Sequence, residues 1–205
     1  MHANRKTKNR LLATRFRGLL PVVVDIETSG LNPATDALLE IAAVTLQMDE
    51  HGYLFPDQTY TYHIEPFIGA HIDPESLAIN HINPTDPLRY AIPEQHALHA
   101  ISLKINKLLQ ATQCQRAVLV GHNAWFDLAF IQAALKRCQL NKGVFHSFTS
   151  FDTATLAAVT LGETVLARAT RAAGIKFDIN QAHSALYDAE CTAQLFCYMV
   201  NLWNK

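Results

Sequence analysis

The stretch Pro21-Val-Val-Val-Asp-Ile-Glu27 decides the fold, because it places two acids inside a run that otherwise predicts a buried strand. A turn sequence, Ser29-Gly-Leu-Asn-Pro33, ends the strand directly afterwards. Residues i and i+2 of a strand point to the same face, so the carboxylates of Asp25 and Glu27 converge. Two adjacent carboxylates repel each other unless a cation or hydrogen bonds compensate, and Mg²⁺ or Mn²⁺ prefers such oxygen ligands. The pair therefore indicates a metal site or, alternatively, the solvated end of a strand.

The elements around this strand predict an α/β fold with a mixed sheet flanked by helices. Short connections favour antiparallel pairing of strands expected at 37–46 and 58–65. The region 66–93 is rich in Pro, Asn and Asp, so we expect a long connection with one short helix. Strands alternating with helices in the second half are typical of a mixed sheet. We expect these strands at 117–120 and around 147–151, and helices at 94–110, 124–140, 152–161, 164–173 and 184–203.

The length and composition are typical of one globular domain. The chain has 205 residues, 49% hydrophobic and 17% charged, which excludes a disordered chain, a collagen-like repeat and a coiled-coil rod. The longest apolar run, Leu19–Val24, is too short to cross a bilayer, so no membrane association is expected. Cysteines stand at 114, 138, 191 and 197 without metal-ligand spacing. Free thiols and a cytoplasmic location are therefore expected.

Charge is distributed unevenly along the chain. Six of the 17 cations precede the first acid, Asp25, and they are Arg5, Lys6, Lys8, Arg10, Arg15 and Arg17. The remaining 11 cations stand against 18 acids, a net charge of −7. This asymmetry predicts a basic, flexible N-terminal arm at 1–14 and a single domain at 15–205. Such an arm suits a polyanionic partner, although a solvated tail would show the same pattern.

Two further acids and a histidine stand where helices are expected to begin. Asp127 follows the expected N-cap Asn123, and Asp188 follows Ser184, so the helix dipole alone would favour either carboxylate. In a regular helix, His183 would lie about 140° away from Asp188. His183 can share a site with Asp188 only from the loop before that helix, where an imidazole beside a metal site suits the role of general base. An exposed loop histidine is the alternative.

Together these motifs resemble a known superfamily. The chain is similar to the DEDD 3′–5′ exonucleases in their histidine variant, whose three motifs are Asp-x-Glu, Asn-x-x-x-Asp and His-x-x-x-x-Asp in this order. The fold of those enzymes is ribonuclease H-like. The flanking residues resemble the ribonuclease T family in particular, and the match runs from Arg15 to about Trp203. The stretches that carry it include Gly121-His-Asn-Ala-Trp-Phe-Asp127, Phe151-Asp-Thr-Ala154 and Gln181-Ala-His-Ser-Ala-Leu-Tyr-Asp188.

The resemblance implies a centre with two divalent metal ions, Mg²⁺ or Mn²⁺. Asp25 would bridge both ions, Glu27 and Asp188 would complete the first, and Asp127 would hold the second. His183 would stand at the same centre as the general base. Such a pair of ions clamps the attacking and leaving oxygens of an in-line displacement, and the product would be a nucleoside 5′-monophosphate released from the 3′ end.

The resemblance also implies contacts with nucleic acid. Phe126 and Phe148 match base-stacking positions, and Glu75 matches a residue near the terminal base. Leu31 and Ile79 stand where the better-known members carry phenylalanine, so we expect apolar contact there without stacking, and the family's reluctance at 3′-terminal cytosine is not carried over.

A basic patch is implied as well. Arg15, Arg17 and Arg116 match a patch that faces the active site of the partner subunit, which implies a homodimer. Gln110 stands where the family often has lysine, which would weaken this patch.

These inferences predict a metal-dependent 3′–5′ exoribonuclease that trims structured RNAs such as tRNA precursors and also acts on single-stranded DNA. Alternatives are a proofreading-type deoxyribonuclease subunit, a catalytically silent nucleic-acid-binding module and a metal-dependent phosphomonoesterase. The basic arm disfavours the deoxyribonuclease subunit, and the complete acid set with His183 disfavours the silent module. A phosphomonoesterase would leave Phe126, Phe148 and the arm without a role.

Overall fold

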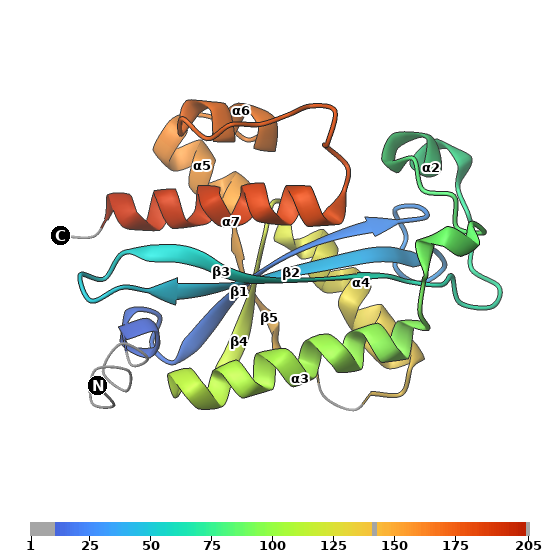
Figure 1. The fold of residues 1–205 in the computed structure, drawn as a ribbon, viewed down its shortest axis with the longest axis horizontal. Coiled ribbons are helices and arrows are strands. Elements are labelled where there is room, and N and C mark those ends of the chain that lie inside the picture. Colours follow the sequence, from blue (N-terminus) through green and yellow to red (C-terminus); the bar gives the residue numbers. More distant parts are fainter. Residues whose placement is uncertain (1–10, 141–142, 204–205) are drawn as a thin grey trace.

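The computed structural model describes residues 11–140 and 143–203. Within these residues five strands form one sheet in the order β3-β2-β1-β4-β5 (Figure 1). β1 pairs antiparallel with β2, β2 pairs antiparallel with β3, and the pairs β1–β4 and β4–β5 are parallel, which confirms the predicted mixed sheet. The strands are β1 (Leu19–Thr28), β2 (Leu38–Met48), β3 (Leu54–His63), β4 (Arg116–Gly121) and β5 (Phe145–Asp152).

Helices cover both faces of the sheet. α7 packs on β1, β2 and β3 with α5 and α6 beside it, while α3 and α4 lie on the other side (Figure 1). The helices are α2 (Pro74–Asn80), α3 (Glu94–Thr112), α4 (Ala124–Arg137), α5 (Thr153–Leu161), α6 (Leu166–Ala172) and α7 (Ala185–Leu202), with a 3₁₀ helix at Pro87–Arg89. The predicted flanking helices are thus confirmed, and the connection 66–93 holds one more short helix than predicted.

The central strand is buried on both faces, as its β-branched run predicts. Val22, Val23 and Val24 are each 0% exposed and pack between the two helical layers. Because each large apolar side chain contributes roughly 1.5–3 kcal/mol when it is fully buried, this strand is a rigid element. It is therefore a firm base for the polar residues at its carboxyl end.

The third strand begins earlier than predicted. β3 starts at Leu54, whereas the sequence pattern places the strand at 58–65. Its first residue is fixed by Asn201 of α7, whose side chain exchanges two hydrogen bonds with the Leu54 backbone, at 2.8 and 2.9 Å. Pro56 is tolerated because β3 lies at the edge of the sheet.

The folded part of the chain extends N-terminal to the predicted domain start at residue 15. Residues 11–15 are helical, and Leu12 is 3% exposed within the main core. Phe16 follows and stacks on Phe196 of α7, with ring centroids 6.3 Å apart. Residues 11–14 therefore belong to the folded body because they bury apolar side chains, while residues 1–10 of the predicted arm lie outside the described structure.

One ion pair fixes the far end of α4. The Arg137 guanidinium donates to both carboxylate oxygens of Glu94, at 2.7 and 3.0 Å, at the start of α3. It also lies over the Phe67 ring, 4.0 Å from the centroid, in the connection that carries α2. Because the pair is largely buried and doubly hydrogen-bonded, it joins α3, α4 and this connection in one orientation.

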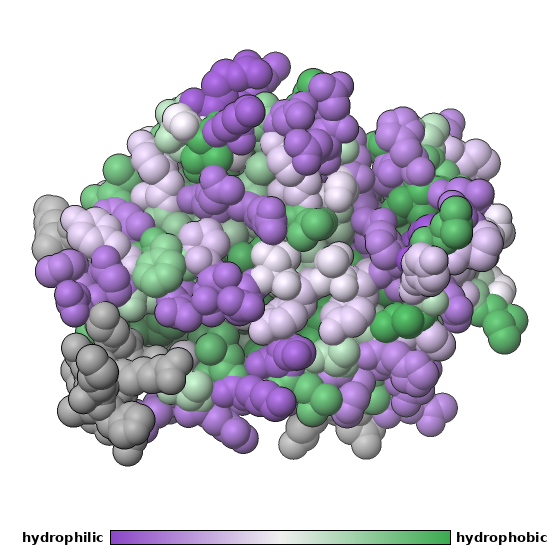
Figure 2. Space-filling model, viewed as in Figure 1, coloured by the Kyte–Doolittle hydropathy of each residue, from purple (hydrophilic) through white to green (hydrophobic). Residues whose placement is uncertain are grey.

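The surface is mixed in polarity, and the cysteines agree with the expectation from the sequence. Hydrophilic residues and small clusters of hydrophobic residues are intermixed over the face formed by α7 and α3 (Figure 2). All four cysteines are free, which confirms the predicted free thiols. In the described part of the chain, no helix has the length and hydropathy needed to cross a membrane.

Candidate active site

Parallel pairing of β1 with β4 brings two of the acidic motifs together. The paired segments end at Val23 and Val120, so the carboxyl ends of both strands lie at the same edge of the sheet. Asp25 and Glu27 follow in β1, and β4 leads into α4, which carries Asp127. Asp127 is 5% exposed, and its carboxylate faces the backbone N–H of Ile26, between the two acids of β1.

Gly121 makes this close approach possible. A Cβ atom at this position would lie 3.0 Å from Oδ2 of Asp127 and 3.1 Å from Cα of Ala124. Both distances are shorter than ordinary van der Waals contact, and the second involves backbone, which cannot move aside. A side chain at position 121 would therefore push Asp127 away from β1.

A residue of β5, not the predicted N-cap, holds the start of α4. Asn123 occupies the N-cap position in a left-handed conformation, with φ of 68°, and its side chain makes no capping hydrogen bond. Instead, Oδ1 of Asp152 accepts hydrogen bonds from the backbone N–H groups of Asn123 and Ala124, at 2.8 and 3.2 Å. Burial opposes ionisation of Asp152, but hydrogen bonds from Thr155, Ala124 and Asn123 outweigh it and lower the pKa.

The third motif enters from the N-terminus of α7. His183 lies in the turn before the helix, with φ of 65°, and its backbone N–H donates to Oδ2 of Asp188 at 2.9 Å. Ligand atoms of Glu27, His183 and Asp188 all lie within 4.8 Å of one another. The structure thus places His183 on the loop and brings the first and third motifs into one cluster.

Repulsion within the cluster disfavours ionisation of its carboxyl groups. Burial and the nearby carboxylates of Asp127, Glu27 and Asp188 raise the pKa of Asp25 well above its ordinary range. Burial, Asp188 and Glu40 raise the pKa of Glu27 to about 8. Burial likewise raises the pKa values of Asp127 and Asp188. Four such groups at one edge require either protons or a cation for balance.

The donor set fits a divalent metal ion. Oδ1 of Asp188 is buried and accepts no hydrogen bond from the described residues. An unsatisfied buried carboxylate oxygen beside Glu27 is costly by itself and is what a hard cation binds. The residues present therefore suit a metal centre formed by Asp25, Glu27, Asp127 and Asp188, with His183 at its exposed side.

Two residues near these acids are not identified by the sequence patterns. Glu40 pairs with Glu27 across β1 and β2, and its carboxylate lies 2.9 Å from Nδ1 of His63. Asn80 is buried at the end of α2, where its amide donates to the Thr28 carbonyl at 3.0 Å and also lowers the pKa of Glu27. A single acid on a strand and a single Asn in a helix give no sequence signal, because their partners are distant along the chain.

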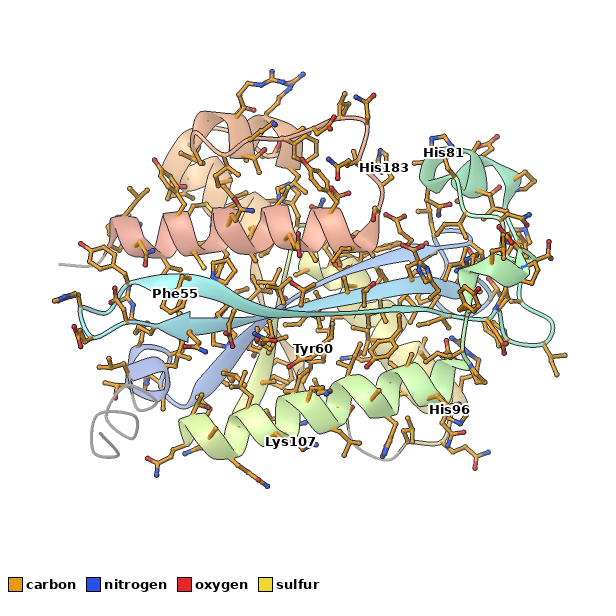
Figure 3. All side chains as sticks on the ribbon, in the orientation of Figure 1. Phe55, Tyr60, His81, His96, Lys107 and His183 are labelled. Carbon is orange, nitrogen blue, oxygen red and sulfur yellow. The ribbon has the colours of Figure 1, made fainter. Side chains whose placement is uncertain are left out.

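A cavity opens beside His183. It has a volume of about 330 Å³ and lies between the end of α2 and the start of α7. Figure 3 shows that His183 and His81 project from these two elements on neighbouring sides of this region. The lining residues include Asn80, His81, His183, Tyr187 and Glu190.

The turn after β1 is built to present Leu31. Oδ2 of Asp36 accepts the backbone N–H of Asn32 at 2.9 Å, and Oδ1 lies 3.1 Å from Nδ1 of His71. Gly30 lies so close to Asp36 that a Cβ atom there would be 2.0 Å from Oδ2. Leu31 is left 78% exposed at the tip.

The other predicted nucleic-acid contacts differ in exposure. Ile79 in α2 is 56% exposed, and Glu75 is exposed in the first turn of the same helix. Phe148 in β5 is 83% exposed and contacts the ring of His146 at 4.6 Å. Phe126 is half-buried against Phe130, at 4.9 Å between centroids, which suits a core role and a stacking role equally.

The predicted basic patch is not part of this cluster. Arg17 precedes β1, and Leu19 at the start of β1 pairs with Arg116 at the start of β4. Arg15, Arg17 and Arg116 are exposed, and so is Gln110 in the last turn of α3. These arginines therefore lie at the end of β1 opposite to the acids.

Fold and site together define a class of protein. A mixed sheet with four acids from three motifs at one edge, and a histidine on the turn before the last helix, is the arrangement of the DEDD exonucleases. The chain belongs to the exonuclease family whose model, RNase_T, matches residues 22–196.

Several curated relatives of this chain share one name. The chain is 56% identical to "Ribonuclease T" of Klebsiella pneumoniae subsp. pneumoniae over 194 residues, which is 95% of this chain and 90% of the relative. It is 55% identical to the protein of that name in Escherichia coli strain K12, with the same coverage. It is 54% identical to "Ribonuclease T" of Yersinia enterocolitica, over 98% of this chain and 93% of the relative.

Solved structures support the same fold. Exonuclease I from Methylocaldum szegediense aligns with a TM-score of 0.67 and 18% identity, over 90% of this chain and 41% of that chain. Escherichia coli exonuclease I in complex with a dT13 oligonucleotide aligns with a TM-score of 0.61 and 19% sequence identity. This alignment covers 86% of this chain and 40% of that one. The chain thus spans about two-fifths of these proteins. The exonuclease family is metal-dependent, and one exonuclease I structure is a zinc-bound form.

Proposed function

We propose that this chain is a 3′–5′ exoribonuclease that trims structured RNAs such as tRNA precursors and also degrades single-stranded DNA. The observation that carries the proposal is the buried, unsatisfied Oδ1 of Asp188 within a cluster of four carboxylates, beside a histidine on an exposed turn. The ribonuclease T relatives, 54–56% identical, favour RNA as the substrate.

The metal ions would be Mg²⁺ or Mn²⁺, and Asp25, Glu27, Asp127 and Asp188 would hold them. Two such ions, when bound, stabilise the charge that develops on the attacking and leaving oxygens of an in-line displacement. The protein contributes a rigid edge: the buried strand fixes Asp25 and Glu27, and Gly121 lets Asp127 approach β1.

His183 acts as the general base. It accepts a proton from the water that attacks the last phosphodiester, and the bond from phosphorus to the 3′ oxygen of the preceding nucleotide breaks. The product is a nucleoside 5′-monophosphate. The exposed position of His183 and its backbone hydrogen bond to Asp188 support this role, because they hold the ring beside the acids and open to solvent.

Apolar and aromatic side chains hold the 3′ tail. Phe126 and Phe148 stack on bases, which contributes roughly 1–3 kcal/mol per base and tolerates any sequence. Leu31 and Ile79 cover the terminal base without stacking, and Glu75 lies nearby to contact its edge. The high exposure of Leu31, Ile79 and Phe148 supports binding roles, since packing does not account for them.

A homodimer supplies the basic contacts. Asp25 lies six positions along β1 from Leu19, which pairs with Arg116, a span of about 20 Å, so the patch is remote from its own acids. One subunit therefore grips the RNA backbone with Arg15, Arg17 and Arg116 while the partner's acids cleave it. The single exonuclease domain acts in the cytoplasm, where its thiols stay reduced.

A trimming assay tests the proposal. The protein is incubated with Mg²⁺ and a 5′-labelled RNA hairpin carrying a single-stranded 3′ tail, next to the Asp25→Asn variant and a DNA strand matching the tail. Stepwise shortening that stops near the duplex, with 5′-monophosphates as product, is expected only with the unaltered protein. Cleavage of the DNA alone would identify a deoxyribonuclease instead, and binding without products would identify a silent module.

A further inference from the structure

Trp125 is an exposed aromatic residue in the first turn of α4. Its surface is 69% exposed, and it stands two residues before Asp127. Its ring meets Phe126 edge-on, with centroids 5.8 Å apart and an interplanar angle of 86°. Phe126 in turn packs on Phe130, which is 0% exposed. Trp125 is therefore the outermost of three rings whose innermost member is anchored in the core.

The helix geometry places this ring near the acids but on another side of α4. Side chains of a helix lean toward its N-terminus, which for α4 is the edge of the sheet that carries Asp25 and Glu27. Trp125 and Asp127 lie about 200° apart around the helix axis. The indole therefore extends away from the carboxylate cluster at the same end of the helix.

The same flank of α4 faces the strand that carries Phe148. Residues seven apart share a helix face, so Gln132 lies on the flank of Trp125. The Gln132 amide donates to the carbonyl of Ser147 in β5, the residue before Phe148. The flank that bears Trp125 is therefore turned toward β5.

Aromatic residues are unequally divided around the site. Phe126, Phe148 and Trp125 come from α4 and β5, whereas Leu31 and Ile79 come from the β1–β2 turn and α2. Stacking on a nucleobase requires a ring with an accessible face, and Trp offers the largest one. A single-stranded tail that leaves the acids along α4 and β5 thus meets rings, and along α2 it meets aliphatic side chains.

We propose that Trp125 stacks on a base of the single-stranded 3′ tail, upstream of the terminal nucleotide. This inference rests on the proposed function, because it needs a nucleic-acid strand in the site. The base is upstream because the terminal phosphate must reach Asp25 and Glu27, while the indole points away from them. A base is the occupant because the ring continues the row of Phe126 and lies on the flank of α4 that faces β5, the strand that carries the exposed Phe148.

Intrinsic fluorescence tests this directly, since the chain has two tryptophans, Trp125 and Trp203. In a Trp203→Phe background, Trp125 is the sole indole. A 5′-labelled RNA with a single-stranded 3′ tail is added in the presence of chelator, so that it is not cleaved. Label anisotropy reports binding, while indole emission and quenching by acrylamide report Trp125. We expect emission to fall, and acrylamide quenching to weaken, over the concentrations at which anisotropy rises.

Variants and abasic substrates locate the contact. Trp125→Ala should weaken single-strand binding about 5- to 150-fold, Trp125→Phe much less, and the exposed control Trp203→Ala not at all. With Mg²⁺, Trp125→Ala should raise KM while kcat stays near normal, because the indole points away from the acids. An abasic site at one upstream position should abolish the emission change.

Other outcomes contradict the inference in distinguishable ways. Binding of the RNA with unchanged Trp125 emission and acrylamide access would overturn it and leave the proposed function intact. An effect of an abasic site at the terminal position alone would overturn the upstream assignment. Shielding of Trp125 before RNA is added, increasing with protein concentration, would assign the ring to a contact with a second copy. Absence of both RNA binding and trimming would overturn this inference and the proposed function together.

Discussion

The backbone N–H of His183 donates a hydrogen bond to the carboxylate of Asp188, although the two residues are five apart along the chain. The bond closes the turn before α7 and holds His183 in a left-handed conformation, with φ of 65°. Only Oδ2 of Asp188 is used, so Oδ1 stays free for a cation. One carboxylate thus places the proposed base and contributes to the proposed metal centre.

Replacing His183 should therefore separate catalysis from binding. General bases contribute typically 10²- to 10⁴-fold, so His183→Gly, whose backbone tolerates this φ, should lower kcat by about that factor. Binding of a single strand without metal should stay near normal, because phosphate and base contacts come from other residues. Added imidazole should restore part of the rate. Asp25→Asn should be more severe and should not respond to imidazole. Nearly normal rates in either variant would exclude the assigned centre.

Thermal stability should depend on metal and pH together. The pKa of Glu27 is raised from about 4.3 in an unfolded chain to about 8 in the folded protein. A raised carboxyl pKa means that the folded state holds a proton which the unfolded state releases between these values. Stability of the metal-free protein should therefore fall as pH rises from about 4 to about 8.

Divalent metal should reverse this loss, because it binds the ionised carboxylates. The increase in Tm caused by Mg²⁺ or Mn²⁺ should grow from pH 5.5 to pH 8, measured against chelator at each pH. Glu27→Gln should raise the Tm of the metal-free protein at pH 8 and reduce the metal increment. An increment that is equal at both pH values, or larger at the lower one, would contradict the account. Full nuclease activity in excess EDTA would do so as well.

Restoring aromatic residues around the terminal base should change end preference. Leu31→Phe with Ile79→Phe adds two rings at exposed positions, so folding should be little affected. Stacking should strengthen binding several-fold and sharpen discrimination among terminal bases. The measurement is the ratio of rates on substrates ending in cytosine and in adenine. Val159→Phe, at a similarly exposed position in α5, is the control. An unchanged ratio would mean that Leu31 and Ile79 do not touch the base.

The parts of this site that the sequence predicts are those set by local periodicity. Alternation along a strand places Asp25 and Glu27 on one face, and the helical angle requires His183 to lie on a loop. Asp152 is different: it caps α4 from β5, while Asn123, the local candidate, makes no capping bond. Partners 28 and 29 residues apart depend on sheet order, which local pattern does not encode.

The same limit applies to Glu40 and to the N-terminal boundary. Glu40 affects Glu27 only through the register of β1 against β2. The charge pattern alone assigns Leu12 to a basic arm, because cations surround it along the chain. In the structure, however, Leu12 packs into the core, with Leu11 beside it. Tertiary contacts decide both cases.

Grip by the basic patch should depend on the partner subunit, because Arg17 and Asp25 lie near opposite ends of β1. Loss of a few phosphate contacts weakens binding and flattens its salt dependence by about 0.7 in log–log slope per contact for single strands. Arg15→Ala with Arg17→Ala should therefore weaken RNA binding and lower this slope, with kcat on short substrates little changed. Gln110→Lys adds a cation in the last turn of α3 and should act in the opposite direction.

Complementation then distinguishes grip in trans from grip in cis. One protein carries Asp25→Asn with its arginines intact, and the other carries Arg15→Ala and Arg17→Ala with its acids intact. In a mixed form of the proposed dimer, the site with working acids would face the subunit with working arginines. Subunit exchange between two nearly inactive preparations should therefore recover substantial trimming activity. If the arginines served their own subunit, no site in the mixed dimer would have both functions. Mixed dimers that are demonstrably present but remain inactive would exclude grip in trans.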